Sequence, residues 1–365
     1  MTAHVPGGGL VAAVELDGDG AHPAAWRWSG RAPADVLGPA ALRSVVRTAE
    51  DAGFALATFA DGPLPPSSGL DAAGRLEAGT RAAFVATTTR SLGLAPTLHV
   101  ATTEPFHLAT QLAALDHATN GRAGWVVGTA NDAASAATVG AVPLGDDALH
   151  RETADVVDVA RALWDSWEDD SVVRDVATGR YLDPDKVHHV DFTGARFTVK
   201  GPLITPRPPQ GQIVVIADAA LGIADRADVV LVRGTDPDDV AAAATRARDA
   251  GAPRVFAEVD VVLDGSDPAA AARLAALDAD TVWPPTGRLR HVGTPAGLVT
   301  VLKRLAGSVD GVRFHPAVLA VDLPLLATEV LPGLRDLLRR PGRTLRASLG
   351  LPRPANRHVA AGSPA

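Results

Sequence analysis

The residues that could do chemistry in this chain stand mostly just after short apolar runs that predict β-strands. They are carboxylates, hydroxyls, imidazoles, one carboxamide and one guanidinium, in chain order Asp61, His99, Thr102, Thr103, Glu104, Thr129, Asn131, Asp132, Asp146, Asp147, His150, Arg151, Asp218 and His315. The set contains neither three carboxylates placed to hold a metal ion nor a plain pair of nucleophile and base. Neutral hydrogen-bonding groups with a few ionisable ones suit a ligand that brings its own reactivity, so the set predicts an organic cofactor.

Several other kinds of site are excluded by inspection. The chain has no GxSxG, HExxH or Walker A sequence, and no GxGxxG that opens a helix after a strand. It has no cysteine, which excludes disulfides, thiol catalysis, cysteine-ligated zinc and iron–sulfur clusters, and which is typical of a cytoplasmic protein. The acidic cluster Asp165, Glu168, Asp169 and Asp170 could suggest a hard metal ion, but a solvated loop is the favoured interpretation, so no metal site is predicted.

Composition limits the class of protein and its partners. The chain has 365 residues, of which 47% are hydrophobic, so it has enough apolar surface for a large core. Its net charge is −8 and it has no run of Lys and Arg, so we expect no nucleic-acid partner. The first 20 residues contain no Lys or Arg and only a short apolar stretch, which argues against a secretory signal. No apolar run approaches 18 residues, so we expect no membrane span.

Strand-like and helix-like segments alternate along the chain. The predicted strands are Gly9–Leu16, Phe54–Ala60, Leu92–Val100, Ala123–Thr129, Gln212–Ala217, Asp228–Val232, Arg254–Val262 and Gly311–His315. The predicted helices are Pro39–Ala52, Gly69–Thr88, Pro105–Thr119, Asp147–Trp167, Pro237–Ala250, Asp267–Leu277, Thr294–Leu305 and Leu323–Leu338. Eight strand–helix repeats indicate an α/β protein with a parallel sheet closed into a (β/α)₈ barrel of the TIM type. An open doubly wound sheet is the alternative that periodicity alone leaves open.

Two segments depart from this alternation. Residues 168–211 are long for a strand–helix connection, and within them Val190–Val199 predicts a β-hairpin, followed by an extended Pro-rich connector at residues 206–211. Residues 341–365 are rich in Pro, Arg and small residues and predict a tail that wraps the surface. We therefore expect one barrel domain over residues 1–340, with the hairpin insertion at 168–211, and a C-terminal surface tail over 341–365.

In a barrel of this kind, chemistry takes place at the carboxyl ends of the strands. Most of the candidates there also have a purely structural interpretation. Asp61 could cap the turn after its strand, and His107, just inside a helix that begins at Pro105, could satisfy a local carbonyl. His150 and Arg151 could belong to a solvated helix start.

Several long motifs resemble one family. The run from Glu104 to Trp125 (EPFHLATQLAALDHATNGRAGW) looks like the central signature of the bacterial-luciferase-like flavin-dependent monooxygenases, in the branch of the nitrilotriacetate and dibenzothiophene sulfone monooxygenase large components. Further segments resemble that branch in the same order, namely residues 22–27, 59–61, 162–169, 183–186, 197–203, 207–211 and 344–357. The resemblance therefore extends over almost the whole chain.

This resemblance implies a luciferase-like barrel that uses reduced FMN, delivered by a separate flavin reductase, together with O₂ to oxygenate a small organic substrate. It also implies that two copies of the chain pair as a homodimer. On the matching positions, His107 and His150 are the candidate catalytic residues. The candidate flavin contacts are Asp61, His99, Thr102, Thr129, His150 and Arg151.

The sequence departs from the family pattern at several of these positions. His99 and His150 stand where the family has a hydroxyl residue and a tyrosine. The family has a Gly/Ser phosphate loop after the fifth strand, whereas here the strand ends in Asp218, whose charge would repel a phosphate dianion by about 1–4 kcal/mol at roughly 4 Å. The chain is also shorter than typical relatives, and the missing stretch of the insertion region is expected after Arg273.

Two other functions remain open because of these departures. One is a degenerate barrel paralogue that binds no flavin and acts as a partner subunit or small-molecule binder. The other is a deazaflavin-dependent oxidoreductase on the same fold.

Overall fold

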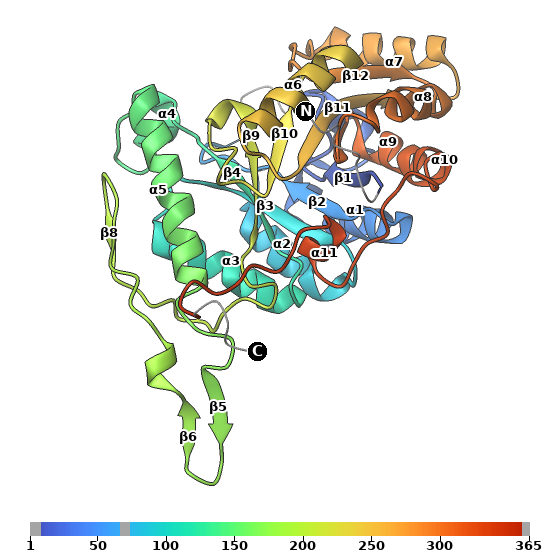
Figure 1. The fold of residues 1–365 in the computed structure, drawn as a ribbon. Coiled ribbons are helices and arrows are strands. Elements are labelled where there is room, and N and C mark those ends of the chain that lie inside the picture. The colour runs from blue at the N-terminus through green and yellow to red at the C-terminus, as the bar shows by residue number, and fades with distance from the viewer. Residues whose placement is uncertain (1–8, 66–73, 360–365) are drawn as a thin grey trace.

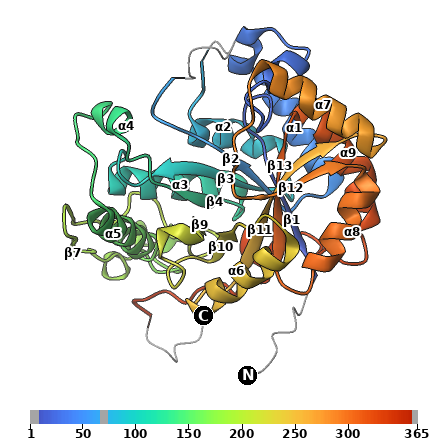
Figure 2. The same ribbon diagram turned by 90° about the horizontal axis from the view of Figure 1, so that it is seen from above.

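The computed structural model describes residues 9–65 and 74–359. Eight parallel strands form a closed ring, seen end-on in Figure 2: β1 (Val11–Glu15), β2 (Leu56–Phe59), β3 (Gly93–His99), β4 (Gly124–Gly128), β9 (Val214–Asp218), β10 (Val229–Val232), β11 (Val255–Leu263) and β13 (Gly311–Pro316). Each strand pairs with the next barrel strand along the chain, and β13 pairs with β1 to close the ring. The predicted (β/α)₈ barrel and all eight of its predicted strands are confirmed.

The helices surround this ring in Figure 2. They are α1 (Pro39–Ala52), α2 (Ala78–Val85), α3 (Pro105–Thr119), α4 (Ala133–Ala137), α5 (Asp146–Trp164), α6 (Pro237–Asp249), α7 (Asp267–Asp280), α8 (Pro295–Leu305), α9 (Leu319–Leu325) and α10 (Leu331–Gly333), with a π-helical segment (Leu326–Val330) between the last two. The helix predicted over residues 69–88 begins only at Ala78, and its first five positions lie outside the described residues. The helix predicted to end at Trp167 ends at Trp164. No helix among residues 9–65 and 74–359 is long and apolar enough to cross a bilayer.

Side-chain caps explain several helix starts. Glu104 accepts hydrogen bonds from the backbone amides of Phe106 and His107 at the start of α3, and Thr294 accepts one from Gly297 at the start of α8. Both helices have proline in their first turn, where a missing N–H costs nothing. These local signals are why the two helix starts were predictable.

One strand of the sheet was not predicted. Strand β12 (Leu289–Gly293) pairs with the second half of β11, which runs for nine residues and extends past its barrel neighbours. Arg290 and His291 interrupt the apolar pattern of β12, so the sequence offered no strand signal there.

The connection between α5 and β9 contains two hairpins. The predicted hairpin is formed by β7 (Phe192–Thr193) and β8 (Thr198–Val199). A second hairpin, β5 (Val172–Asp175) with β6 (Arg180–Leu182), was not predicted and projects away from the barrel in Figure 1.

The acidic cluster of this connection is partly buried: Asp169 and Asp170 are exposed, as expected for a solvated loop, whereas Asp165 is not. Asp165 is buried and accepts hydrogen bonds from Arg207 at 2.8 and 3.0 Å. Asp169 pairs with Arg207 at 2.9 Å and with Arg353 of the C-terminal tail at 2.6 Å. No cluster of possible metal ligands occurs among the described residues. The prediction of a solvated loop is therefore wrong for Asp165, whose carboxylate ties the connection and the tail to the barrel.

The tail also does more than wrap the surface. Its helix α11 (Leu345–Ser348) places Leu345 and Leu349 against the apolar side chains inside the amino-terminal half of the barrel. A Cβ atom added at Gly93 or Gly124 would come within 2.6 or 3.0 Å of the Leu345 methyl groups. These two glycines thus leave the room that lets α11 close this end of the barrel.

Leu345→Ala should lower the free energy of unfolding by about 2–4 kcal/mol, because it leaves a cavity against backbone that cannot collapse. Equilibrium urea denaturation measures the change. Val142→Ala, which shortens a side chain that is 78% exposed, is the control and should alter stability by less than about 0.5 kcal/mol. Equal effects of the two substitutions would show that α11 does not close the barrel.

Candidate active site

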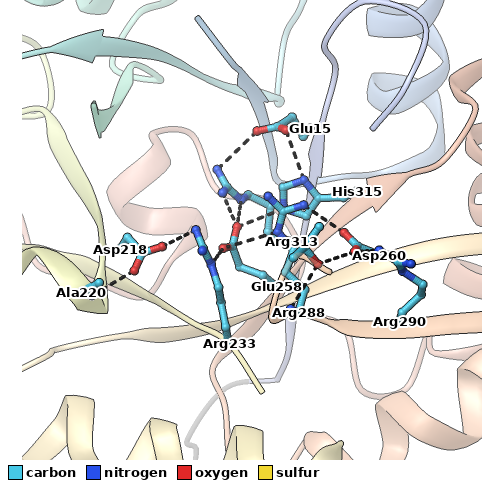
Figure 3. A network of polar contacts seen from close by, with 11 residues as sticks. Glu15, Asp218, Ala220, Arg233, Glu258, Asp260, Arg288, Arg290, Arg313 and His315 are labelled. Carbon is cyan, nitrogen blue, oxygen red and sulfur yellow. Dashed lines mark hydrogen bonds and ion pairs between the residues drawn. The ribbon is translucent and has the colours of Figure 1, made fainter. Parts of the chain in front are cut away.

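The barrel interior changes from apolar to charged along its length. Alternate residues of each strand point inward, and in the amino-terminal half these are apolar side chains such as Val11, Ile216 and Phe256. In the carboxyl-terminal half the same faces carry charged residues, which Figure 3 shows directed toward one another: Glu15, Asp218, Arg233, Glu258, Arg313 and His315. With Asp260, Arg288 and Arg290 they form what we call the mouth network.

His315 joins the two glutamates of the mouth network. Its Nδ1 lies 3.1 Å from Glu15 and its Nε2 lies 3.0 Å from Glu258, and its side chain is fully buried. The two carboxylates therefore share one imidazole, each within hydrogen-bond distance of a different ring nitrogen. Arg313 donates from Nε to the same Glu258 oxygen at 2.9 Å.

The remaining acids of the mouth network are also paired. Arg233 bridges Asp218 at 2.6 Å and Glu258 at 3.0 Å. The fully buried Asp260 pairs with Arg288 at 2.9 Å and with Arg290 at 3.4 Å. Four carboxylates thus face four guanidinium groups and one imidazole, an arrangement in which each charge offsets the burial cost of another.

These pairings shift the pKa values of the buried groups. Burial is the largest influence on the pKa of Glu15 and acts to raise it, but His315, Arg313 and Arg288 together outweigh burial and lower this pKa from 4.5 to about 2. Burial is also the largest influence on the pKa of Glu258 and acts to raise it. Arg313 and His315 outweigh burial, so the pKa of Glu258 lies well below its ordinary range. Both carboxylates are therefore ionised at neutral pH.

A cavity of about 540 Å³ opens at the ends of β2 and β3. Four of the predicted site residues line it: Asp61, His99, Thr102 and His107. The other polar side chains in its wall are Arg75, Glu77, Thr80, Thr97, Thr103 and Gln111. The structure thus brings together the candidates that follow the second and third strands.

Two of these four side chains are already hydrogen-bonded to the backbone. Both carboxylate oxygens of Asp61 accept from amides, those of Gly62 and Ala78, each at 2.8 Å. His99 accepts at Nδ1 from the Ala130 amide at 3.0 Å, so its remaining proton is on Nε2 and is directed at the Asp61 carbonyl oxygen at 3.2 Å. Burial lowers the pKa of His99, in keeping with this neutral form.

The other two are open to a ligand. The side chains of Thr102 and His107 make no hydrogen bond within residues 9–65 and 74–359, and both line the cavity. A hydroxyl and an imidazole at one cavity wall can donate to or accept from a bound molecule.

The remaining candidates do not line this cavity. His150 is exposed on α5, and its Nδ1 lies 3.1 Å from the carbonyl oxygen of Leu221, in the loop that follows β9. Arg151 is exposed beside it, and Thr129 is half-buried after β4. The structure therefore divides the predicted site into a group at β2 and β3, His150 at the β9 loop, and Thr129 and Arg151, which line no part of this cavity.

A second cavity, of about 360 Å³, adjoins the first through Gly74 and Arg75, which line both. Its floor contains Glu15, Arg288 and His315 of the mouth network. The other ionisable groups in its wall are Asp17, Asp19, His22 and Arg81.

Sequence reasoning missed most of the mouth network, naming only Asp218 and His315. A signal was available in β1 and β11, whose strands VAAVE and VFAEVDVVL carry acids within buried apolar runs. An acid at such a position needs a partner, so Glu15 and Glu258 could have been flagged from strand alternation.

The residues at the barrel mouth differ in how well they suit the isoalloxazine ring and the phosphate of a flavin mononucleotide. The hydroxyl of Thr102 is open to exchange a neutral hydrogen bond with an isoalloxazine edge, and the neutral ring of His99, whose nitrogens are both used, can only pack against it. At the end of β9, however, Asp218 accepts from the Ala220 amide at 2.9 Å and pairs with Arg233. A phosphate needs such donors for itself, so the residues present fit the ring of a flavin but not its phosphate. The expected repulsion by Asp218 also needs correction, since Arg233 offsets part of its charge.

Comparison with known proteins identifies the family. The model of the luciferase-like monooxygenases matches residues 20–301, which is most of the barrel. This chain belongs to the luciferase-like monooxygenase family.

Relatives place this luciferase-like chain near the branch inferred from its motifs. It is 34% identical to nitrilotriacetate monooxygenase component A of Aminobacter aminovorans over 54% of this chain and 47% of that protein. It is 34% identical to dibenzothiophene-sulfone monooxygenase of Rhodococcus erythropolis over 53% and 45%. The matched stretch thus spans about half the length of these relatives.

A third relative matches along nearly its whole length. A subunit of the pristinamycin IIA synthase of Streptomyces pristinaespiralis is 34% identical over 90% of this chain and 94% of that protein. Among solved structures, EDTA monooxygenase from Chelativorans sp. BNC1 superposes with a TM-score of 0.83 at 19% identity, covering 94% of this chain and 99% of that one. This structural likeness supports the luciferase-like barrel.

Glu15→Gln should be less stable than the wild type at neutral pH, and the difference should shrink in acid. Because the folded pKa of Glu15 is lowered from 4.5 to about 2, its ionised form stabilises the fold above about pH 4.5, by on the order of 3 kcal/mol, and this stabilisation is lost as the pH falls toward 2. Urea denaturation at pH 7, 5 and 3.5 measures the difference.

The control is Glu329→Gln, which removes an exposed carboxylate on the π-helical segment and should show no such pH dependence. A difference in stability between the wild type and Glu15→Gln that stayed constant from pH 7 to pH 3.5 would contradict the assigned pairing.

Proposed function

We propose that this chain is the oxygenating component of a two-component, flavin-dependent monooxygenase that acts on a small organic substrate. A separate flavin reductase would supply the reduced flavin, with FMN as the form that the family resemblance implies. The observation that carries the proposal is the pair of adjoining cavities at the carboxyl ends of the barrel strands, where enzymes with this fold bind their ligands.

Each cavity has a distinct role in this proposal. A reduced flavin bound in the first cavity, against Thr102 and the ring of His99, supplies the oxygen-activating chemistry. Asp61 and His99 act as positioning residues, because their polar atoms hold the backbone of the surrounding loops. His107, with its side chain unbonded at the cavity wall, is the group that can hold or release a proton there.

The second cavity holds the substrate in this proposal. It shares Arg75 with the first cavity, so molecules bound in the two would lie next to each other. Its floor contains the ion-paired side chains of Glu15, Arg288 and His315, and among the described residues the buried Nε of Arg288 has no hydrogen-bond partner. A homodimer and a cytoplasmic location remain predictions from the sequence.

Anaerobic titration with photoreduced FMN tests the first cavity. Binding should be tighter for the reduced form than for the oxidised form, and Thr102→Val should weaken it about three- to tenfold by removing one hydrogen bond of roughly 1 kcal/mol. Thr245→Val makes the same change on the exposed face of α6 and should leave binding unaltered. Flavin binding that ignores Thr102→Val would contradict this placement.

A second candidate function is a partner subunit that binds no flavin itself. It is favoured by the nearly full-length similarity to a protein named as a synthase subunit, and by a barrel mouth filled with the chain's own ion pairs. Failure of either redox form of FMN and of riboflavin to bind at millimolar concentration would support this candidate. Binding of a deazaflavin alone would instead indicate hydride transfer.

A further inference from the structure

The charges of the mouth network already compensate one another. Each of its four arginines lies within ion-pair distance of a carboxylate of the same network, in the part of the chain that the structure describes. A dianionic group placed at this mouth would therefore meet no arginine of the network that lacks an acid. A neutral ligand needs no counter-charge, so its binding does not depend on an unpaired arginine.

Asp218 is the most exposed acid of the mouth network, since Glu15, which lines the second cavity, is 18% exposed. Glu258 and Asp260 are fully buried, whereas the Asp218 side chain is 24% exposed and stands at the last position of β9. Its partner Arg233, 45% exposed, lies beside it and also holds Glu258, as Figure 3 shows. The rim at β9 and β10 thus presents a carboxylate together with the guanidinium that neutralises it.

We propose that Asp218 makes this chain select a flavin without a phosphate group, so that reduced riboflavin binds at least as tightly as reduced FMN. The inference rests on the proposed function, because it takes the flavin ring to lie in the first cavity with its side chain directed toward β9. In that arrangement the neutral hydroxyls of a ribityl chain meet Asp218 and Arg233 as a pair. A terminal phosphate would have to compete with Asp218 for Arg233.

Asp218→Asn removes the negative charge of this side chain and keeps the local fold. Asparagine accepts an amide hydrogen bond at a turn start as aspartate does, so the contact to Ala220 is kept while Arg233 loses one of its two acids. The substitution therefore leaves the guanidinium partly free for an incoming phosphate.

The experiment measures anaerobic dissociation constants of reduced riboflavin and reduced FMN for the wild type and for Asp218→Asn. For the wild type, the ratio of the FMN constant to the riboflavin constant should be one or more. In Asp218→Asn this ratio should fall about five- to tenfold, as expected for removing a like charge about 4 Å from a phosphate. Thermal melting of each variant confirms that it is folded.

Asp249→Asn is the matched control. It removes the same charge from an exposed position at the end of α6, so it reports the effect of the net charge of −8 alone. Its FMN-to-riboflavin ratio should equal that of the wild type. Raising the salt concentration should also tighten FMN binding to the wild type and leave riboflavin binding unchanged, because salt screens only the charged ligand.

The possible failures are distinguishable. Absence of binding by both flavins would overturn the proposed function and this inference together. Tighter binding of FMN than of riboflavin to the wild type, or a ratio that Asp218→Asn leaves unchanged, would overturn this inference alone. Loss of such an FMN preference in Arg75→Gln would show that the phosphate lies instead at Arg75, the loosely paired cation between the two cavities, whose nearest acid is 3.7 Å away.

Discussion

The burial of Glu258 is the constraint on which the mouth of this barrel depends. A fully buried carboxylate is tolerated only when it is paired, and four side chains surround it: Arg233, Arg288, Arg313 and His315. The first, third and fourth stand on or directly after β10 and β13, which both pair with β11, so the acid lies between these three partners in the sheet itself. Removing any one partner would leave charge uncompensated, which ties the geometry of the mouth to the register of the barrel.

The two halves of the barrel interior are therefore held by different physics. The amino-terminal half is an apolar core that α11 closes from outside, and it gains stability from area removed from water. The carboxyl-terminal half gains little from that source and relies on ion pairs, which are directional and fix side chains in place. Ion pairs also anchor the tail and the α5–β9 connection. Arg346 of the tail pairs with Asp228, and Arg207 of the connection pairs with Asp165.

This difference explains what the sequence could predict. Apolar runs such as VVLV in β10 and local signals such as Pro105 act within a few residues, so the eight barrel strands and the start of α3 were predicted correctly. Pairings between distant residues leave no local trace: Glu15 and His315 are 300 positions apart, and no spacing rule joins them. Asp165 was misjudged for the same reason, because its partner Arg207 lies 42 residues away.

The candidate site shows a related limit. Knowledge of strand ends placed Asp61, His99, Thr102 and His107 around one cavity, but it could not tell which of them face a ligand. The structure makes that distinction by hydrogen-bond capacity. Both acceptor oxygens of Asp61 and both ring nitrogens of His99 are used by amides and a carbonyl, so these two residues shape the cavity.

Ligand choice at such a mouth depends on what its rim leaves unpaired. Groups buried deep in the mouth network, such as Asp260, cannot respond to a ligand without giving up a partner. Groups at the rim can, because water and ligand both reach them. Asp218 and Arg233 are the pair at which the compensated interior meets the solvent, so neutralising Asp218 alters what can bind there while Arg233 keeps its contact with the buried Glu258. In a barrel filled with its own ion pairs, the choice between charged and neutral ligands is thus made at the edge of the mouth network. The buried carboxylates contribute by pairing with every arginine of that network.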